Sequence, residues 1–474
     1  MSEQFDLAVL GGGPGGYLAA IRAAQLGAKV ALVEKERIGG TCLNRGCIPT
    51  KTLLRNVEVW QTTRRAQEFG ISIIGEVSVD FPRLMARTRE VVDNLVNGVI
   101  GLLAGHGVRL YAGLGRLVGG SAEGWRLQIS PTAGGETAEI TARQVILAVG
   151  AVSARPPIPG VNLPGVLTSR HLLALNQQPQ SLVVIGASVV GVEFASMFAA
   201  LGTKVTVLGR RTFLKEAEEQ LARRYRPLLA RQGITVDIGL EFREIVPGEA
   251  GLRVVYDKGG TQKVAEGEVV LLSTGRVPAT AGLGLAELGL TLNGRTIAVN
   301  ERLATNLPGV YAVGDAIGEP MLASVAYYEG AIAAENALGA QRTADYSAVP
   351  NCIFTIPEIA GVGLTEAEAR QKGLRFKVSR FPYSALGKAM ALGETEGQVR
   401  MICEEGTGRV LGMHALGYHA SDLIAEGALA VRLGLTAKDI AETMHGHPTL
   451  PEGTQEAALG FDDATIHYRK VRGE

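Results

Sequence analysis

The N-terminal part of the chain alternates short apolar runs with glycine-rich turns. The run over 5–10 is almost wholly apolar, which is typical of a strand buried on both faces. After six residues that are mostly glycine, apolar positions over 17–27 recur at helical spacing, and a second apolar run follows over 28–34. Strand, glycine turn, helix and strand in this order predict a βαβ unit.

The same pattern returns over 181–211. Further apolar runs over 145–151, 269–276 and 309–316 each lead into a glycine turn. A proline-rich stretch over 155–165 is typical of a linker. The repeat predicts two nucleotide-binding folds, and two nucleotides in one chain normally exchange electrons.

The last third of the chain loses this pattern. After about Val349 the glycine turns stop, and alternating runs such as 397–405 mix with helical segments such as 421–434. This mixture is typical of a separate α+β domain. The sequence therefore predicts four domains with the boundaries 1–150, 151–275, 276–348 and 349–474.

The first glycine turn carries the pattern G-x-G-x-x-G at Gly11, Gly13 and Gly16. Glycines at these positions allow a tight turn, close approach of a pyrophosphate to the backbone, and tight packing of the helix on the strand. The helix N-terminus offers unpaired N–H groups to the phosphates. Glu34, at the end of the second strand, is placed to accept hydrogen bonds from a ribose, so these features together predict a dinucleotide site.

The second glycine turn keeps Gly186 and Gly191 but has Ser188 in place of the middle glycine. Serine is a small substitute, so we expect a functional site with slightly displaced phosphates. The alternative is a decayed duplicate that keeps only the fold. With both turns, the sequence predicts an α/β protein with two Rossmann-like dinucleotide-binding domains and a C-terminal α+β domain.

The second βαβ repeat, over 181–211, differs from the first repeat at the end of its second strand. Where the first unit has a carboxylate, the second has Gly209, followed by Arg210 and Arg211. Loss of the carboxylate removes a partner for a ribose 2′-hydroxyl, and guanidinium groups can bind a 2′-phosphate. This favours NADP over NAD, and the alternative is that both arginines belong to a solvated loop.

Charge and composition narrow the choice of partners. Lysine and arginine number 47, as do aspartate and glutamate, so no charge excess points to nucleic acid or an anionic membrane. No apolar run approaches the roughly 20 residues that span a bilayer, and the N-terminus lacks a signal-peptide pattern. We therefore expect a cytoplasmic protein, in which closely spaced cysteines are more often metal ligands or redox-active than structural.

Two of the four cysteines, Cys42 and Cys47, lie five positions apart after the first βαβ unit. Zinc would need two further ligands, and Cys352 and Cys403 are isolated, so we expect those two to be single buried thiols. A pair of inert buried thiols is the other alternative. A disulfide between Cys42 and Cys47 would require a distorted helical turn, and a strained, accessible disulfide suits a catalytic bond.

A dithiol needs a base to take its proton, because the thiolate is the nucleophile. Near the C-terminus the sequence has His447 followed by Glu452, a candidate base and a carboxylate to orient it. The alternative is a structural histidine.

The stretch GGTCLNRGCIPTK over 39–51 resembles the active-site signature of the flavin-dependent pyridine nucleotide–disulfide oxidoreductases. The two glycine-rich folds and the stretches VYAVGDA and HGHPTLPE follow one another in the same order as in that family. The resemblance therefore covers essentially the whole chain. Within the family, CIPTK, PMLASVAYYEG, FPYSALGKAMALGETEG and HGHPTLPEGTQEAAL are most similar to dihydrolipoamide dehydrogenases.

The resemblance implies FAD in domain 1–150, completed by 276–348, NAD or NADP in 151–275, and a dimerisation domain in 349–474. Beyond the first glycine turn, the cofactor-binding residues that it implies are Glu34, Thr41, Lys51, Gly150, Asp315, Gly186, Gly191, Glu193, Arg210, Arg211 and Arg276.

The resemblance also implies the catalytic roles. Cys47 matches the thiolate next to the flavin and Cys42 the cysteine that exchanges with substrate sulfur. His447 and Glu452 match the catalytic histidine and its orienting glutamate, which the other subunit of a homodimer supplies. Lys51 matches a lysine that pairs with a glutamate, and Glu193 stands at the position of that glutamate. The implied reaction oxidises dihydrolipoamide to lipoamide and passes electrons through FAD to NAD(P)⁺. The implied partner is a small dithiol or a lipoyl domain, with a 2-oxo acid dehydrogenase complex as a candidate host.

Two positions depart from the dihydrolipoamide dehydrogenase pattern, Ser188 and Gly209, and the arginines that follow Gly209 are more similar to glutathione and mercuric reductases. An NADPH-dependent disulfide reductase similar to glutathione reductase is therefore the first alternative. A mercuric reductase-like enzyme is the other alternative, although that family carries vicinal cysteines near its C-terminus and this sequence has none there. A soluble transhydrogenase is less expected, since that group lacks the cysteine pair. A non-catalytic flavoprotein would have no need of His447 and Glu452.

Overall fold

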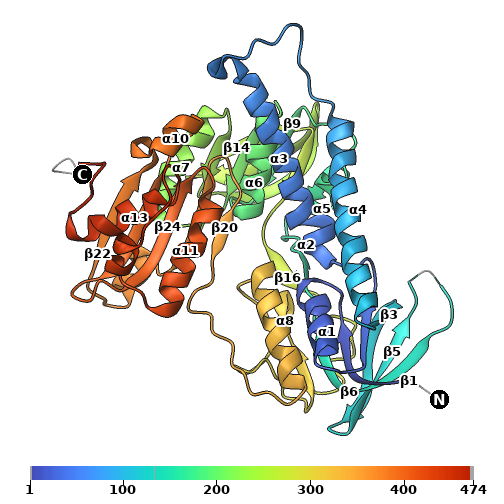
Figure 1. The fold of residues 1–474 in the computed structure, drawn as a ribbon. Coiled ribbons are helices and arrows are strands. Elements are labelled where there is room, and N and C mark those ends of the chain that lie inside the picture. The colour runs from blue at the N-terminus through green and yellow to red at the C-terminus, as the bar shows by residue number, and fades with distance from the viewer. Residues whose placement is uncertain (1–2, 133, 470–474) are drawn as a thin grey trace. The chain divides into compact units, whose positions relative to one another are not determined.

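The computed structural model describes residues 3–132 and 134–469, which form two compact units, each built from separate stretches of chain (Figure 1). The first unit takes the described residues of 1–155, 168–177 and 275–344. The second takes those of 156–167, 178–274 and 345–469. Within each unit, segments far apart in the sequence therefore pack together.

The first unit is built on one mixed sheet. Among the described residues its strand order is β3-β2-β1-β6-β5-β4, and β19 also pairs with β6. The strands β3, β2, β1, β6 and β19 are parallel, whereas β4 and β5 extend the sheet with antiparallel pairing. The strands are β1 (Glu3–Leu10), β2 (Val30–Glu34), β3 (Arg109–Ala112), β4 (Leu114–Ser121), β5 (Gly124–Ser130), β6 (Ala138–Leu147) and β19 (Val310–Ala312).

Two helices, α1 (Pro14–Gln25) and α8 (Ala323–Ala337), lie side by side against this sheet (Figure 1). A Cβ atom on Gly330 of α8 would lie 2.4 Å from the carbonyl oxygen of Gly15, so the close approach of the helices requires glycine there. The apolar residues of β1 are buried because helices cover the central strands, and this burial on both faces is what the uninterrupted apolar run predicts.

The second unit contains a parallel sheet with the order β11-β10-β9-β15-β8 and a three-stranded antiparallel sheet, β12-β13-β14. The helices α6 (Val189–Ala200) and α7 (Glu219–Arg231) connect β9 to β10 and β10 to β11. The strands are β8 (Val166–Thr168), β9 (Ser181–Ile185), β10 (Lys204–Gly209), β11 (Thr235–Ile238), β12 (Glu241–Gly248), β13 (Gly251–Lys258), β14 (Thr261–Gly267) and β15 (Val269–Leu272). The repeat of the first βαβ unit is therefore confirmed.

The C-terminal part of the second unit is an antiparallel sheet, β20-β21-β24-β23-β22, with helices packed on it. Every residue of the central strand β24 is buried, because its neighbours and α11 cover it. The strands are β20 (Asn351–Ile353), β21 (Glu358–Gly363), β22 (Phe376–Pro382), β23 (Gln398–Glu404) and β24 (Val410–Gly417). The main helices are α11 (Ala420–Leu433), α12 (Ala437–Glu442) and α13 (Glu452–Leu459).

The predicted fold class, an α/β protein with two Rossmann-like domains and a C-terminal α+β domain, is confirmed. The finer boundaries of the four domains stay a prediction. Further elements are η1 (Ala66–Phe69), α4 (Phe81–Gly105), α5 (Ser169–Leu172), β17 (Leu292–Asn293), β18 (Thr296–Ile297), α9 (Glu366–Gln371), η3 (Tyr383–Ala385), α10 (Gly387–Leu392) and η4 (Gly460–Asp462).

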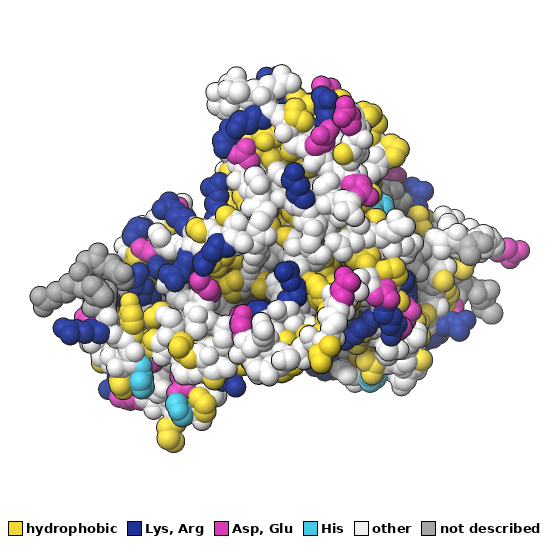
Figure 2. Space-filling view, turned by 90° about the horizontal axis from the view of Figure 1, so that it is seen from above, with side chains coloured by type: hydrophobic (Ala, Val, Ile, Leu, Met, Phe, Trp, Pro, Cys, Tyr) yellow, Lys and Arg dark blue, Asp and Glu magenta, His cyan; other side chains and the backbone are white. Residues whose placement is uncertain are grey.

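The surface mixes charges of both signs. Figure 2 shows lysine and arginine side chains interspersed with aspartate and glutamate over the face in view, as the equal numbers of the two kinds lead one to expect. Within the part of the chain that the structure describes, no helix is both long enough and apolar enough to cross a membrane.

Candidate active site

A break between two helices of the first unit brings Cys42 and Cys47 together. Helix α2 (Gly40–Arg45) ends before Gly46, and α3 (Cys47–Arg64) begins after it. Gly46 has φ −140° and ψ −111°, which is not helical, and the side chains of the two cysteines are hydrogen-bonded across this turn. The sequence predicted a distorted turn here because a regular helix would separate residues five apart.

The two thiols share their protons unequally. The pKa of Cys42 is raised by its hydrogen bond to Cys47, by burial and by the negative charge of Cys47, and Lys51 opposes this. The negative charge of one sulfur therefore opposes ionisation of the other. The pair is therefore arranged to hold one thiolate and one thiol.

The first glycine turn leaves open the side where a phosphate would bind. A Cβ atom on Gly11 would lie 2.2 Å from the carbonyl oxygen of Ala148, and one on Gly16 would lie 1.8 Å from that of Gly11, so protein packing requires both glycines. At Gly13 a Cβ atom would meet only Gly40 Cα, at 3.8 Å. Packing does not require glycine at this position, whereas close approach of a pyrophosphate would.

Glu34 is oriented by two backbone groups. Its Oε2 atom accepts a hydrogen bond from the N–H of Gly12 at 2.7 Å, and its Oε1 atom accepts one from the N–H of Glu36 at 2.8 Å. Each carboxylate oxygen has a second lone pair, which can accept a ribose hydroxyl. The carboxylate therefore lies beside the glycine turn, where the predicted nucleotide site needs it.

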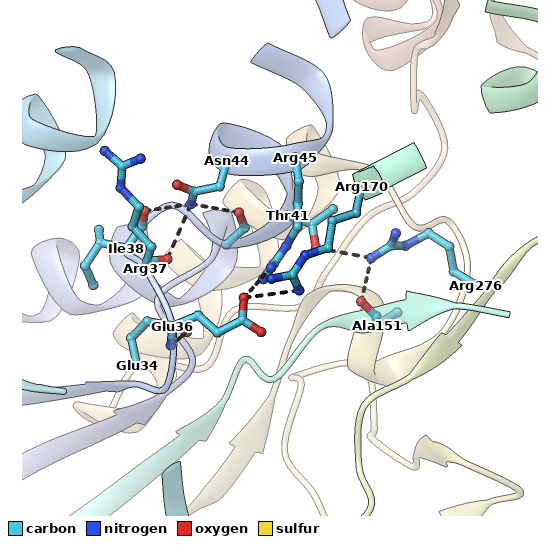
Figure 3. A network of polar contacts seen from close by, with 11 residues as sticks. Glu34, Glu36, Arg37, Ile38, Thr41, Asn44, Arg45, Ala151, Arg170 and Arg276 are labelled. Atoms are coloured by element: carbon cyan, nitrogen blue, oxygen red, sulfur yellow. Dashed lines mark hydrogen bonds and ion pairs between the residues drawn. The ribbon is translucent and has the colours of Figure 1, made fainter. Parts of the chain in front are cut away.

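Arg276 contacts two other predicted cofactor-binding residues of the first unit, and Figure 3 shows its contact with one of them, Thr41. Its Nε atom donates to Asp315 Oδ2 at 3.2 Å, and its Nη2 atom donates to Thr41 Oγ1 at 3.3 Å and to the carbonyl of Ala151 at 2.6 Å. Asp315 lies in η2 (Gly314–Ile317), and the strands β7 (Ala151–Ser153) and β16 (Arg276–Pro278) pair there. Thr41, Arg276 and Asp315 are thus brought together.

Two more predicted positions lie in these elements. Gly150 follows β6 with φ +66°, a conformation that favours glycine. Lys51 stands in the second turn of α3, four residues after Cys47. Its predicted pairing with Glu193 stays a prediction.

Charged residues that the sequence analysis did not select fix the dithiol turn (Figure 3). Glu36 pairs with Arg45, which lies between the two cysteines, and with Arg170 at 3.5 Å. Although burial opposes ionisation, these arginines lower the pKa of Glu36. Asn44 Nδ2 donates to the carbonyls of Ile38 at 2.9 Å and Gly40 at 3.0 Å. The polar residues inside CLNRGC therefore hold α2 on the loop after β2.

Two tyrosines near the dithiol also escaped sequence analysis. The hydroxyl groups of Tyr17 on α1 and Tyr327 on α8 are 2.7 Å apart, and their rings meet edge to face. Burial raises the pKa of both, and charges on Cys42 and Cys47 raise them further, so both phenols stay neutral beside a thiolate. No sequence signal joins residues 310 positions apart.

His447 and Glu452 form the predicted pair. His447 Nδ1 lies 2.8 Å from Glu452 Oε1, and Glu452 Oε2 accepts the N–H of Thr449 at 2.7 Å. Burial opposes ionisation of Glu452, but these two hydrogen bonds outweigh it and lower its pKa. With Nδ1 engaged, Nε2 of the exposed imidazole is the atom that can take a proton. The pair belongs to the second unit, and its approach to a dithiol stays a prediction.

The second glycine turn accommodates its serine. Ser188 Oγ donates to the carbonyl of Ser273 at 2.9 Å. Gly186 has φ +117°, and a Cβ atom on Gly191 would lie 2.2 Å from the carbonyl oxygen of Gly186. Glu193, buried on α6, accepts the N–H of Phe354 at 2.8 Å. The serine hydroxyl is thus bound to the backbone just after β15, and the predicted displacement of the phosphates stays a prediction.

A side chain at the end of β10 would have to displace the tip of Ile238. A Cβ atom on Gly209 would lie 2.6 Å from Ile238 Cδ1 and 3.0 Å from Ala187 Cβ. Arg210 and Arg211 follow and are exposed. Neither guanidinium has a hydrogen bond or ion pair with any residue in 3–132 or 134–469. Both are therefore available to an anion.

The other two cysteines differ in exposure. Cys403 on β23 is buried, and burial raises its pKa to about 12, so it is an inert thiol as expected. The prediction that Cys352 is buried was wrong. Cys352 is partly exposed because β20, the strand that carries it, lies at the edge of its sheet.

The sequence matches the family described as "Pyridine nucleotide-disulphide oxidoreductase" over residues 5–330 and the dimerisation domain of that family over 349–458. The chain is 39% identical to dihydrolipoyl dehydrogenase of Bacillus subtilis, covering 99% of this chain and 100% of the relative. It is 40% identical to dihydrolipoyl dehydrogenase of Chlamydia muridarum, with 100% of each covered.

Solved structures are similar along nearly the whole chain. LpdA from Mycobacterium tuberculosis matches with a TM-score of 0.89 and 30% identity, covering 97% of this chain and 99% of that one. The HOCl-induced flavoprotein disulfide reductase RclA from Escherichia coli matches with a TM-score of 0.84 and 28% identity, covering 96% and 99%.

The stepwise ionisation of the Cys42 and Cys47 thiols can be measured by titration. As pH rises, ultraviolet thiolate absorbance of the reduced protein should increase in two separate steps, because the charge of one sulfur delays ionisation of the other. Cys42→Ser and Cys47→Ser should each leave one step, at a lower pH than the second step of the wild type, and Cys352→Ser serves as the control with both steps. Two thiols that titrate together near the usual cysteine pKa of about 8.5 would contradict the arrangement.

Proposed function

Since the chain belongs to the pyridine nucleotide–disulphide oxidoreductase family, we propose that it oxidises dihydrolipoamide to lipoamide and passes the electrons to a nicotinamide dinucleotide. The observation that carries this proposal is the hydrogen-bonded pair Cys42 and Cys47 in the unit that contains the first dinucleotide turn. Two sulfurs this close can open and close a disulfide without moving the helices apart. Relatives named dihydrolipoyl dehydrogenase support the choice of substrate.

The residues of the first unit fit FAD. The open face at Gly13 suits a pyrophosphate, and Glu34 is oriented beside it to accept a ribose hydroxyl. Bound there, FAD would supply the two-electron chemistry between a thiolate and a nicotinamide. The residues that would hold it are Gly11, Gly13, Gly16, Glu34, Thr41, Lys51, Gly150 and Asp315, with Arg276 fixing Asp315 and Thr41.

The sulfur chemistry uses the chain's own residues. A thiolate of dihydrolipoamide attacks Cys42 Sγ of the oxidised pair, which breaks the Cys42–Cys47 bond and releases Cys47 as a thiolate. The second substrate thiol then displaces Cys42, closing lipoamide and leaving the enzyme with the two electrons as a dithiol. Hydrogen bonding from Cys42 stabilises the Cys47 thiolate.

The base in this proposal is His447. Nε2 takes the proton from a substrate thiol, while Glu452 holds Nδ1–H and stabilises the imidazolium. His447 of the partner subunit would serve each dithiol in a homodimer, and the match to the family's dimerisation domain supports this assembly. We also propose a cytoplasmic enzyme that acts on free dihydrolipoamide or a lipoyl domain, with a 2-oxo acid dehydrogenase complex as candidate host.

For the nicotinamide substrate we propose NADP. The exposed Arg210 and Arg211 have no protein partner among the described residues, and Gly209 removes the carboxylate that would hold a free 2′-hydroxyl. The same arginines favour a second candidate function, an NADPH-dependent reductase of another disulfide such as glutathione disulfide.

Replacing the base should slow dithiol oxidation more than any other step. We expect His447→Gln to lower kcat/KM for dihydrolipoamide by roughly 10²- to 10⁴-fold, as loss of a general base does. Glu452→Gln should cost less, because the imidazole remains. His419, which pairs with Asp422 at 2.6 Å on the same unit, gives the control His419→Gln with unchanged activity. Equal activity of His447→Gln and the control would remove His447 from the mechanism.

A panel of substrates tests the activity and the choice of cofactor. Dihydrolipoamide should be oxidised faster than glutathione disulfide or Hg(II) is reduced, and NADP⁺ should be preferred to NAD⁺. Arg210→Ala and Arg211→Ala should each raise KM for NADP⁺ roughly tenfold, because each removes a charge-assisted contact, and leave KM for NAD⁺ unchanged. A clear preference for NAD⁺ would overturn the proposal on the cofactor, and a preference for glutathione disulfide would favour the second candidate.

A further inference from the structure

The loop 210–218, between β10 and α7, is fastened at one end to the second glycine turn. The N–H of Leu214 donates to the carbonyl of Ala187 at 2.9 Å, and the N–H of Ala217 donates to the carbonyl of Leu214 at 3.0 Å. Leu214 is 1% exposed, so its side chain anchors this end. The arginines stand between Gly209, fixed in β10, and this anchor.

The other end of the loop is held by the C-terminal sheet of the same unit. Glu218, only 3% exposed, caps α7 by accepting the N–H of Leu221 at 3.1 Å. Its carboxylate also lies 3.6 Å from Nε of Arg400, a buried residue of β23. Asn351 Nδ2 of β20 donates to the carbonyl of Glu216 at 2.8 Å. Both contacts connect the loop to strands more than 130 positions away in the sequence.

Packing alone does not hold this end of the loop. A cavity of about 140 Å³ lies behind it, lined by 216–218 on one side and by residues of β20, β21 and β24, including His414, on the other. Arg400 Nε has no hydrogen-bond partner in 3–132 or 134–469 and faces the carboxylate of Glu218, while Nη2 of the same guanidinium donates to Glu366 Oε2 at 2.8 Å. The carboxylate of Glu218 is costly to bury unless it is paired, so its ion pair with Arg400 resists displacement of the loop into the cavity.

We propose that Glu218 and Arg400 are positioning residues for nucleotide specificity, whose ion pair fixes the loop 210–218 so that Arg210 and Arg211 face the 2′-phosphate of NADP(H) already ordered. This inference rests on the proposed preference for NADP. An arginine that is ordered before binding loses less entropy when it binds, and only a ligand with a 2′-phosphate gains from that.

The test uses Glu218→Gln in the full-length holoenzyme. The amide oxygen still accepts the N–H of Leu221, so the helix cap remains while the charge and the ion pair are lost. KM for NADPH should rise roughly three- to tenfold, the cost of ordering two long side chains, with kcat and KM for NADH unchanged. Calorimetry should give the same loss of affinity for adenosine 2′,5′-bisphosphate and none for AMP.

Two more variants complete the design. Asn351→Ala removes the hydrogen bond to the carbonyl of Glu216 and leaves both charges of the Glu218–Arg400 pair in place. It should raise KM for NADPH in the same way, and it replaces Glu218→Gln if that variant proves too unstable to purify. Arg231→Gln breaks the exposed pair between Arg231 at the far end of α7 and Glu396, 3.1 Å apart, and should change neither KM.

The outcomes separate this inference from the proposal on which it rests. If the wild type prefers NADPH and the variants keep that preference unchanged, the positioning role is wrong and the proposed cofactor stands. A rise in KM for both cofactors, or a loss of kcat, would mean a general structural role and would also overturn it. A wild type that prefers NADH would remove the proposed cofactor and the inference together.

Discussion

The hydrogen bond between Cys42 and Cys47 across the non-helical Gly46 is the interaction on which the rest of the site depends. It exists because two helices, which would separate these side chains if continuous, are interrupted at one residue. A Cβ atom on Gly46 would lie 2.9 Å from the carbonyl oxygen of Thr41, so glycine is needed for the turn to close. The ionic contacts of Arg45 and the hydrogen bonds of Asn44 keep the turn in place from outside.

The sequence predicts those parts of the candidate site that come from neighbours along the chain. The glycines of the first turn, Glu34 and the cysteine pair each belong to one continuous stretch whose spacing has a physical meaning, and His447 lies only five positions from Glu452. Contacts between distant stretches gave no such signal. Tyr17 meets Tyr327 because α1 and α8 pack together, and Arg276 reaches Thr41 because 275–344 folds into the first unit.

The same distinction explains the one burial prediction that was wrong and the residues that were missed in the second unit. Cys352 has an apolar neighbour in sequence, but its exposure is set by the edge position of β20, which only the sheet order reveals. The sequence shows Arg210 and Arg211 as a pair of charges, but it does not show which residues hold the loop that carries them. Glu218 and Arg400 meet across a sheet and a loop, and no periodicity joins them.

In the proposed mechanism the sulfur of Cys47 would face a bound flavin and supply electrons to it as a thiolate. The direct measurement is the visible spectrum of the purified enzyme after two-electron reduction, compared between the wild type and Cys47→Ser. The proposed mechanism requires a long-wavelength thiolate–flavin absorption that is present in the wild type and absent from the variant, with flavin still bound to both. An absorption that survives in the variant, or a purified wild type without flavin, would contradict it.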